Sequence, residues 1–151
     1  MKLTKIKAQA RLLAVLAALS PTACAFLGPT QPDNPLIGTW TTQDHNQVTV
    51  RADAVVLTPD KGQAATMGPA DCNGRYKMQI GRMETASLQK SFPTQPDLQS
   101  KLRQLLVKPD YPVVDVTCDQ GGTTYLLLDN SRMLAIYRDA GVGGVEAYSR
   151  I

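Results

Sequence analysis

Alternation of apolar and polar residues is the main pattern of the chain after residue 35, and it predicts β-strands. In the run 47–51, for example, Val48 and Val50 fall on one face of an extended chain and polar residues fall on the other. Runs of this kind, rich in β-branched and aromatic residues, occupy 36–42, 47–51, 54–58, 72–80, 113–118, 123–128, 132–138 and 145–151. The sequence thus predicts seven or eight strands. The pattern is ambiguous from Gly81 to Ser87, where one interpretation is a turn followed by a short strand near Thr85–Leu88.

One segment has a helical period instead and predicts an amphipathic helix at about 95–107. Its apolar stripe consists of Leu98, Leu102, Leu105 and Leu106. Thr94 is expected to act as the N-cap, with Asp97 at the third helical position completing a capping box. Lys108 suits the carboxyl end of a helix dipole, and Pro109 prevents the helix from continuing.

Together these elements predict a mainly β (α+β) fold: an antiparallel seven- or eight-stranded rolled sheet or small barrel with one amphipathic helix. Tight turns connect the strands of a meander over 113–138. Asp44-His45-Asn46 is expected to form a turn. Two glycine-containing stretches, Pro59–Ala70 and Ala140–Gly144, are expected to be loops.

The first 23 residues have the organisation of an export signal. Four basic residues precede an apolar run at 12–19, and no acidic residue occurs before Asp33. Eight helical residues span about 12 Å, whereas crossing a bilayer takes about 20 residues, so the run is too short for a membrane span. Export to the bacterial cell envelope is the expectation.

Cleavage of this signal is open between two sites. Pro21-Thr22-Ala23-Cys24 resembles a bacterial lipobox, which implies acylation of Cys24 and, because Ala25 follows, an outer-membrane lipoprotein facing the periplasm or the surface. The alternative is cleavage after Ala25 by the ordinary signal peptidase, which leaves a soluble periplasmic protein. The proline-rich residues 24–35 are expected to form a tether, and 36–151 a single β-rich domain.

Removal of the signal changes the charge of the protein. The whole chain carries 16 basic and 13 acidic residues. The signal holds four of the basic ones, so the mature part has a net charge of about −1. Without a basic cluster, nucleic acid is not an expected partner.

Cys72 and Cys118 are the cysteines that remain after Cys24 is acylated or removed. In an oxidising compartment they are expected to form a disulfide. The alternative is two reduced cysteines that act as small buried hydrophobes.

Candidate catalytic chemistry is sparse. Ser87 and Lys90 match the S-x-x-K pattern, but the companion motifs of penicillin-recognising enzymes are absent from the sequence. His45 is the only histidine and falls in the expected turn. We therefore expect no enzyme activity, no cofactor and no metal site.

Two resemblances bear on function. Gly38-Thr39-Trp40 is similar to the G-x-W signature of lipocalins, which implies that Trp40 closes one end of a barrel and that a late arginine, Arg138 or Arg150, packs across it. Lipocalins carry small apolar ligands. The sequence from Cys72 to Arg138 resembles the META (HslJ-like) domain of small envelope lipoproteins, through Cys72-Asn73 and the Gly74-x-Tyr76 that follows, then a helix and closing strands.

The expected function is binding of another macromolecule in the envelope, without catalysis. One alternative is inhibition of a periplasmic or host hydrolase, such as a protease or lysozyme, by insertion of the loop Pro59–Ala70 or Ala140–Gly144. A second alternative is transport of a small apolar ligand.

Overall fold

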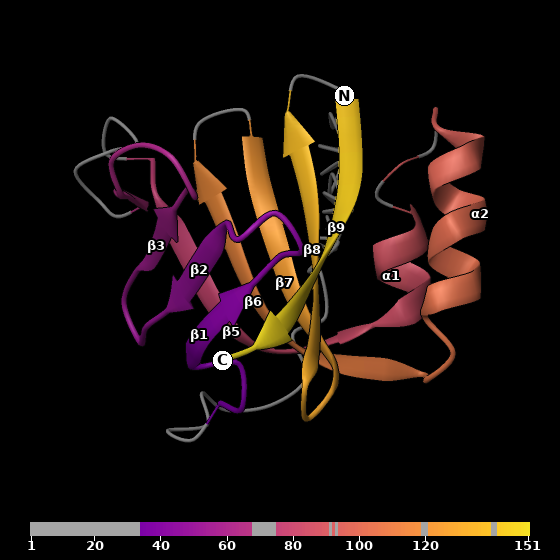
Figure 1. Cartoon of the computed structure of the whole chain (residues 1–151). Helices are drawn as coiled ribbons and strands as arrows, with labels where there is room; N and C mark the ends of the chain where they lie inside the picture. Colours follow the sequence, from indigo (N-terminus) through magenta and orange to yellow (C-terminus); the bar gives the residue numbers. More distant parts are fainter. Residues whose placement is uncertain (1–33, 68–74, 91, 93, 119–120, 140–141) are drawn as a thin grey trace, which may run out of the picture.

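In the described part of the chain, nine strands form a single antiparallel sheet (Figure 1). The computed structural model describes residues 34–67, 75–90, 92, 94–118, 121–139 and 142–151. The strands are β1 Gly38–Thr41, β2 Gln47–Val50, β3 Val55–Thr58, β4 Ala65–Met67, β5 Lys77–Glu84, β6 Asp110–Cys118, β7 Gly121–Asp129, β8 Arg132–Asp139 and β9 Val142–Arg150. The helices are α1 Thr85–Lys90 and α2 Pro96–Leu105.

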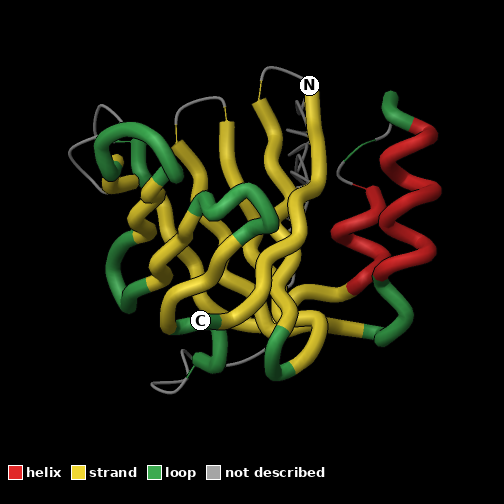
Figure 2. Tube along the Cα trace, in the orientation of Figure 1, coloured by secondary structure: helices red, strands yellow, loops and turns green. Residues whose placement is uncertain are grey.

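The strands follow the order β4-β3-β2-β1-β9-β8-β7-β6-β5, and the sheet curls into a half-barrel (Figure 2). Within the described residues β4 and β5 form its two ends and do not pair with each other. The prediction of a mainly β, antiparallel rolled sheet is confirmed, with nine strands in place of seven or eight.

Each face of the sheet buries its own apolar cluster because side chains alternate along a strand. The concave face packs Trp40, Val48, Val50, Val116 and Tyr125 with their neighbours, as the alternation in the run 47–51 predicts. The opposite face packs against the helices. Its buried residues are Leu88, Phe92, Leu102, Leu106, Tyr111, Val113, Leu126, Leu134 and Ile136.

The predicted amphipathic helix corresponds to α2, whereas the short strand expected near Thr85–Leu88 is wrong. Those residues form α1, and Leu88 is its only buried residue. A strand is favoured when alternate side chains are buried, whereas one helical turn places a single leucine against α2 and the sheet. The backbone N–H of Thr85 donates to the Pro109 carbonyl (2.9 Å), which brings the start of α1 beside the segment after α2.

The predicted capping box is also wrong. Gln95, not Thr94, is the N-cap of α2, and no side chain caps it. The chain instead folds back on itself: the Gln95 N–H and the Gln99 side-chain amide both donate to the Phe92 carbonyl, at 3.2 and 2.8 Å. These bonds fix the entry to the helix without a hydroxyl at position 94.

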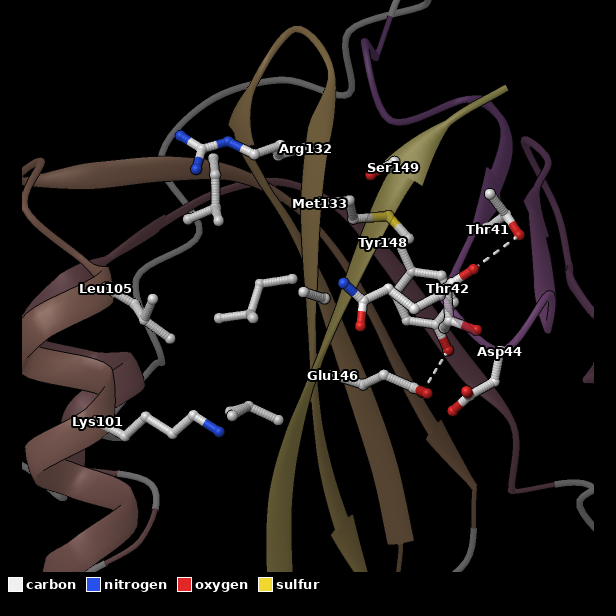
Figure 3. A pocket seen from close by; sticks show the side chains of 15 residues that line it. Thr41, Thr42, Asp44, Lys101, Leu105, Arg132, Met133, Glu146, Tyr148 and Ser149 are labelled. Atoms are coloured by element: carbon white, nitrogen blue, oxygen red, sulfur yellow. Dashed lines mark hydrogen bonds between the residues drawn. The ribbon is translucent and has the colours of Figure 1, made fainter.

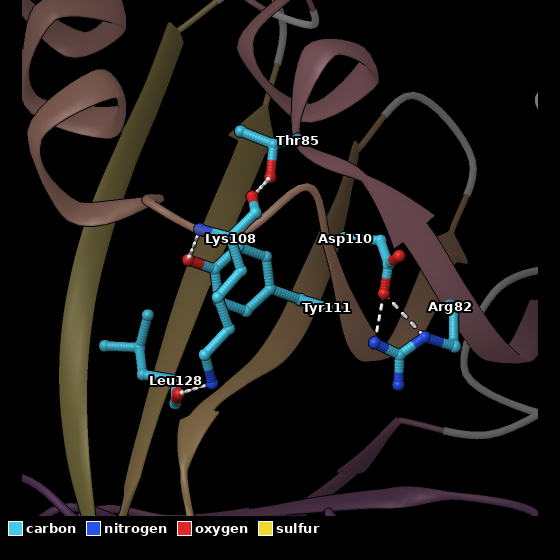
Figure 4. Close-up of polar contacts among 6 residues, drawn as sticks. All are labelled: Arg82, Thr85, Lys108, Asp110, Tyr111 and Leu128. Carbon is cyan, nitrogen blue, oxygen red and sulfur yellow. Dashed lines mark hydrogen bonds and ion pairs between the residues drawn. The ribbon is translucent and has the colours of Figure 1, made fainter.

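Lys108 joins the helices to the sheet rather than capping α2, which ends at Leu105 (Figure 4). Its carbonyl accepts from the Thr85 hydroxyl (2.6 Å), and its backbone N–H donates to the Tyr111 hydroxyl (3.0 Å). Its ammonium donates to the Leu128 carbonyl (2.7 Å). Nearby, Arg82 forms an ion pair with Asp110 across β5 and β6.

The two expected loops are partly strand. Residues 65–67 of the first form β4, which pairs with β3. Gly143 and Gly144 of the second belong to β9 and pair with Arg138 and Tyr137 of β8. A Cβ atom at Gly143 would overlap the Phe92 ring, and one at Gly144 would overlap the Tyr137 side chain. Both glycines therefore permit close packing within the sheet, where the sequence predicted a loop.

Candidate functional site

A groove with a volume of about 530 Å³ lies along β9, between α2 and the turn that connects β1 to β2 (Figure 3). The groove exists because β9 has only one full-length neighbour. It pairs with β8 from Val142 to Ser149. On its other side β1 pairs only with Ser149 and Arg150, after which the chain turns away.

The two walls of the groove carry opposite charge. Lys101 and Leu105 extend from α2 on one side, and Leu105 is 37 % exposed. Asp44 lies on the other side, in the β1–β2 turn. His45 follows it with φ 61°, a left-handed conformation that small turns accommodate. The turn at Asp44-His45-Asn46 is thereby confirmed.

Tyr148 and Glu146 lie on β9 between these walls. The Tyr148 hydroxyl donates to the Glu146 carboxylate at 2.6 Å (Figure 3). Burial, and then the hydrogen bond to and charge of Glu146, raise the pKa of the Tyr148 phenol. The phenol therefore stays protonated at physiological pH and acts as a hydrogen-bond donor rather than a base.

A second hollow of about 380 Å³ shares Tyr148 and Glu146 and opens on the concave face. Val48, Leu57 and Ala65 give it an apolar lining.

Trp40 is fully buried, and its indole N–H donates to the Leu36 carbonyl at 2.9 Å. The guanidinium of Arg150 lies over the indole ring, 4.4 Å from its centroid. Of the two arginines proposed for this position, Arg150 occupies it. Arg150 also bonds the Pro35 carbonyl, so it fastens the start of the described chain to its end.

Arg138 has a different role from the one proposed for it. It lies on β8, and its Nη2 atom is 2.9 Å from Asp115 Oδ1. The buried Thr124 hydroxyl bonds the same carboxylate. Asp115 was not among the residues predicted for a site. The available signal was a carboxylate alternating with valines within 113–118, since such a residue needs a partner when it faces a covered surface.

Tyr76 is half-buried against the concave cluster. Its hydroxyl donates to the Asp53 carbonyl (3.3 Å) and lies 3.2 Å from the Met78 sulfur. Partial burial, and then the charge of Asp53, raise its pKa. Tyr76 thus connects β5 to the segment between β2 and β3.

The remaining predicted site residues are not brought together. Ser87 lies in α1, and His45 lies in the β1–β2 turn. Cys118 ends β6. Cys24 and Cys72 lie outside the described residues, as do the export signal and most of the tether, so these predictions stay predictions.

Within the described residues, neither a metal site nor a membrane-spanning helix is found. No three His, Cys, Asp or Glu side chains there are grouped so that they could hold a metal ion. No helix there is long and apolar enough to cross a membrane.

Comparisons of the chain with known protein families, with curated proteins and with solved structures found no match. The lipocalin and META resemblances therefore remain predictions from short motifs.

Proposed function

We propose that this chain is an exported, non-enzymatic protein of the bacterial cell envelope that acts by binding another protein in the β9 groove. The observation that carries the proposal is the groove itself. It combines a strand edge, an exposed leucine and two oppositely charged walls. Those are features of recognition surfaces, which place a few polar groups around apolar contacts.

The chemistry of the groove favours binding over catalysis. Its buried hydroxyl, on Tyr148, already donates to Glu146. A general base needs an accessible group that exchanges protons near neutral pH, and a phenol with a raised pKa does not meet that need.

The export signal and Cys24 support the location. Acylation of Cys24 would anchor the domain to the outer membrane through residues 24–35, whereas cleavage after Ala25 would release it into the periplasm.

Site-specific photocrosslinking in intact cells tests the proposal. A photoreactive amino acid at Leu105, which lines the groove, should give a crosslinked product. The matched control is Val107, which lies two residues further along, is 82 % exposed and does not line the groove. Absence of a product at position 105, or equal products at both positions, would contradict the proposal.

The hollow on the concave face favours transport of a small apolar ligand as a second candidate function. Organic extraction of protein purified from cells, followed by mass spectrometry, should then release a lipid in stoichiometric amount. Leu57→Glu, which places a charge in that lining, should abolish recovery of the lipid. A protein that carries no lipid excludes this candidate.

The hydrolase-inhibitor alternative is supported best by residues 59–64, which precede β4 and are all exposed, whereas Gly143 and Gly144 of the other proposed loop pair with β8. Asn46 holds this loop through a bond from the Asp60 N–H (3.1 Å). Deletion of residues 60–63 should abolish inhibition of a protease or lysozyme. If the full chain does not inhibit either, the alternative is excluded.

A further inference from the structure

We infer that β9 binds its partner by strand addition: a short extended segment of the partner pairs with the backbone of Val145 and Ala147. This inference rests on the proposed function and specifies how the groove recognises a protein. The peptide would continue the line of β1, antiparallel to β9.

Hydrogen bonds along β9 show which backbone groups face the groove. The Arg150 N–H donates to Ser131 beside β8, whereas the N–H groups of Ile151 and Gly143 donate to Thr39 and to the Gln95 side chain, away from β8. Residues of β9 alternate between these two directions, and the β8–β9 register has no bulge.

Val145 and Ala147 therefore direct their N–H and C=O groups away from β8. Neither residue pairs with another described strand on that side, and both line the groove. Ala147 is exposed. Four backbone groups are thus available to an added strand, the arrangement by which extended peptides join sheet edges.

The open edge has a boundary at each end. β1 pairs with Ser149, and the Gln95 side chain occupies the N–H of Gly143 at 3.2 Å. The interval between them fits an extended segment of about five residues. A second copy of the nine-residue β9 would run into both boundaries, so the short segment is the favoured occupant.

This edge also lacks the usual protection against pairing. Charged side chains and very short strands usually prevent the edge of a sheet from pairing with another chain. The end strand β5 carries the exposed Lys77, Arg82 and Glu84, and the other end strand, β4, has three residues. From Gly143 to Ala147, β9 has one charged residue, Glu146, which already accepts a bond from Tyr148.

The walls specify the side chains of the segment. Val145 packs in the cluster on the helix side of the sheet, and Ala147 pairs with Leu134 of the same cluster. The peptide residues that pair with Val145 and Ala147 would face Leu105 and Lys101. These two side chains favour an apolar and an acidic residue in the peptide. The other peptide residues would lie on the concave side of the sheet and face Asp44, whose negative charge favours basic side chains.

The pentapeptide acetyl-Lys-Leu-Lys-Glu-Lys-amide is the probe that this pattern defines. Amide exchange followed by NMR in the free protein should show fast exchange at Val145 and Ala147 and slow exchange at Glu146 and Tyr148, which face β8. The peptide should slow the first pair at least about tenfold. The charge-reversed peptide acetyl-Glu-Leu-Glu-Lys-Glu-amide is the matched control and should not.

Ala147→Pro removes the outward N–H without removing a donor to β8, a position at which edge strands tolerate proline. It should weaken binding of the probe about tenfold, whereas Ala147→Ser should not. If Ala147→Pro does not fold, the unmodified protein with a probe N-methylated at the Leu and Glu residues replaces it and should show the same loss.

The inference would be overturned by protection of Val145 and Ala147 in the free protein, by equal binding of both peptides, or by binding that the proline and N-methyl changes leave intact. Protection that grows with protein concentration alone would assign the edge to a second copy and would also overturn it. A crosslink at Leu105 that survives Ala147→Pro would preserve the proposed function and reject strand addition.

Discussion

At the residue scale, one aromatic–cation contact joins the two ends of the domain. Arg150 covers the Trp40 ring and bonds the Pro35 carbonyl, 115 positions away in sequence. Trp40 is wholly buried, and the guanidinium covers one face of its indole ring.

We expect Arg150→Met to lower the free energy of unfolding by about 1 kcal/mol, since methionine keeps the apolar stem and loses the charge over the ring. Urea unfolding measures the change. Arg132→Met is the control, because the side chain of Arg132 is 68 % exposed in its ion pair with Asp129, and such pairs contribute little. Equal losses in both variants would contradict the role assigned to Arg150.

A second residue-scale prediction concerns alkaline pH. Burial, above all, raises the pKa of Tyr125 to about 12, from 10.0. The unfolded chain then loses the proton first, so stability is constant below pH 10 and falls as the pH rises to about 12, by about 2 kcal/mol from this group. Tyr125→Phe should reduce that loss in urea titrations at pH 9 and 11.5. Tyr137→Phe, at a 46 % exposed ring, is the matched control and should not.

The position of a single residue was predictable from the sequence when burial alone determines that position. A lone tryptophan in a β-branched run belongs in the core, and Trp40 is there. The choice between Arg138 and Arg150 was not predictable, because it depends on which strand lies next to β1. Arg138 instead forms an ion pair with Asp115.

At the scale of elements, the Tyr111 hydroxyl links the segment after α2 to the sheet. The Tyr111 hydroxyl accepts the backbone N–H of Lys108, in the turn that returns the chain from α2 to β6 (Figure 4). The Tyr111 ring is buried against the helix-side cluster.

Tyr111→Phe should lower the free energy of unfolding by about 1 to 2 kcal/mol, because it keeps the ring and leaves that N–H without its acceptor. Lys108→Met is the control: it removes the exposed bond to Leu128 but keeps the backbone N–H, and should cost less than about 0.5 kcal/mol. Denaturant midpoints at a single pH measure both. A phenylalanine variant as stable as the parent would show that water satisfies Lys108.

Strong periodic patterns predicted elements well, and weak ones did not. The alternation in 47–51 and the meander over 113–138 correspond to β2 and to β6–β8. α1 and β4 were missed because each is short and held by tertiary contacts, so the six residues of α1 carry one buried side chain as their only signal. The Thr94 cap failed for the same reason, since the Phe92 carbonyl supplies what the local motif was expected to supply.

At the scale of the whole molecule, maturation and the Cys72–Cys118 pairing remain to be measured. Intact mass of the protein purified from cells should report acylation at Cys24, or cleavage after Ala25, together with the loss of two protons on disulfide formation. We expect Cys118→Ser to lower stability by about 4 kcal/mol, the chain-entropy value for a loop of about 47 residues.

Ala25→Ser is the control for this experiment, because it leaves both of those cysteines in place. Alkylation of both Cys72 and Cys118 without a reductant would contradict the pairing. A mature protein that retains residues 1–23 would contradict export.

The class of the fold was predictable, and the groove was not. Composition and alternation are local properties, and they indicate an antiparallel curled sheet. The open edge of β9 arises from the pairing of the first strand with the final one over only two positions, a relation that no local pattern contains.

That junction has a consequence for synthesis. Among the described strands, β1 to β4 join the rest of the sheet through β9, so Trp40 lacks the cover of Arg150 until residues 142–151 have been synthesised. A product truncated before residue 142 would lack Tyr148 and Arg150 and would expose the indole of Trp40 to solvent. The backbone N–H of Ile151 donates to the Thr39 carbonyl where β1 meets β9. A purification tag fused at Ile151 would therefore disturb the pairing that completes the sheet.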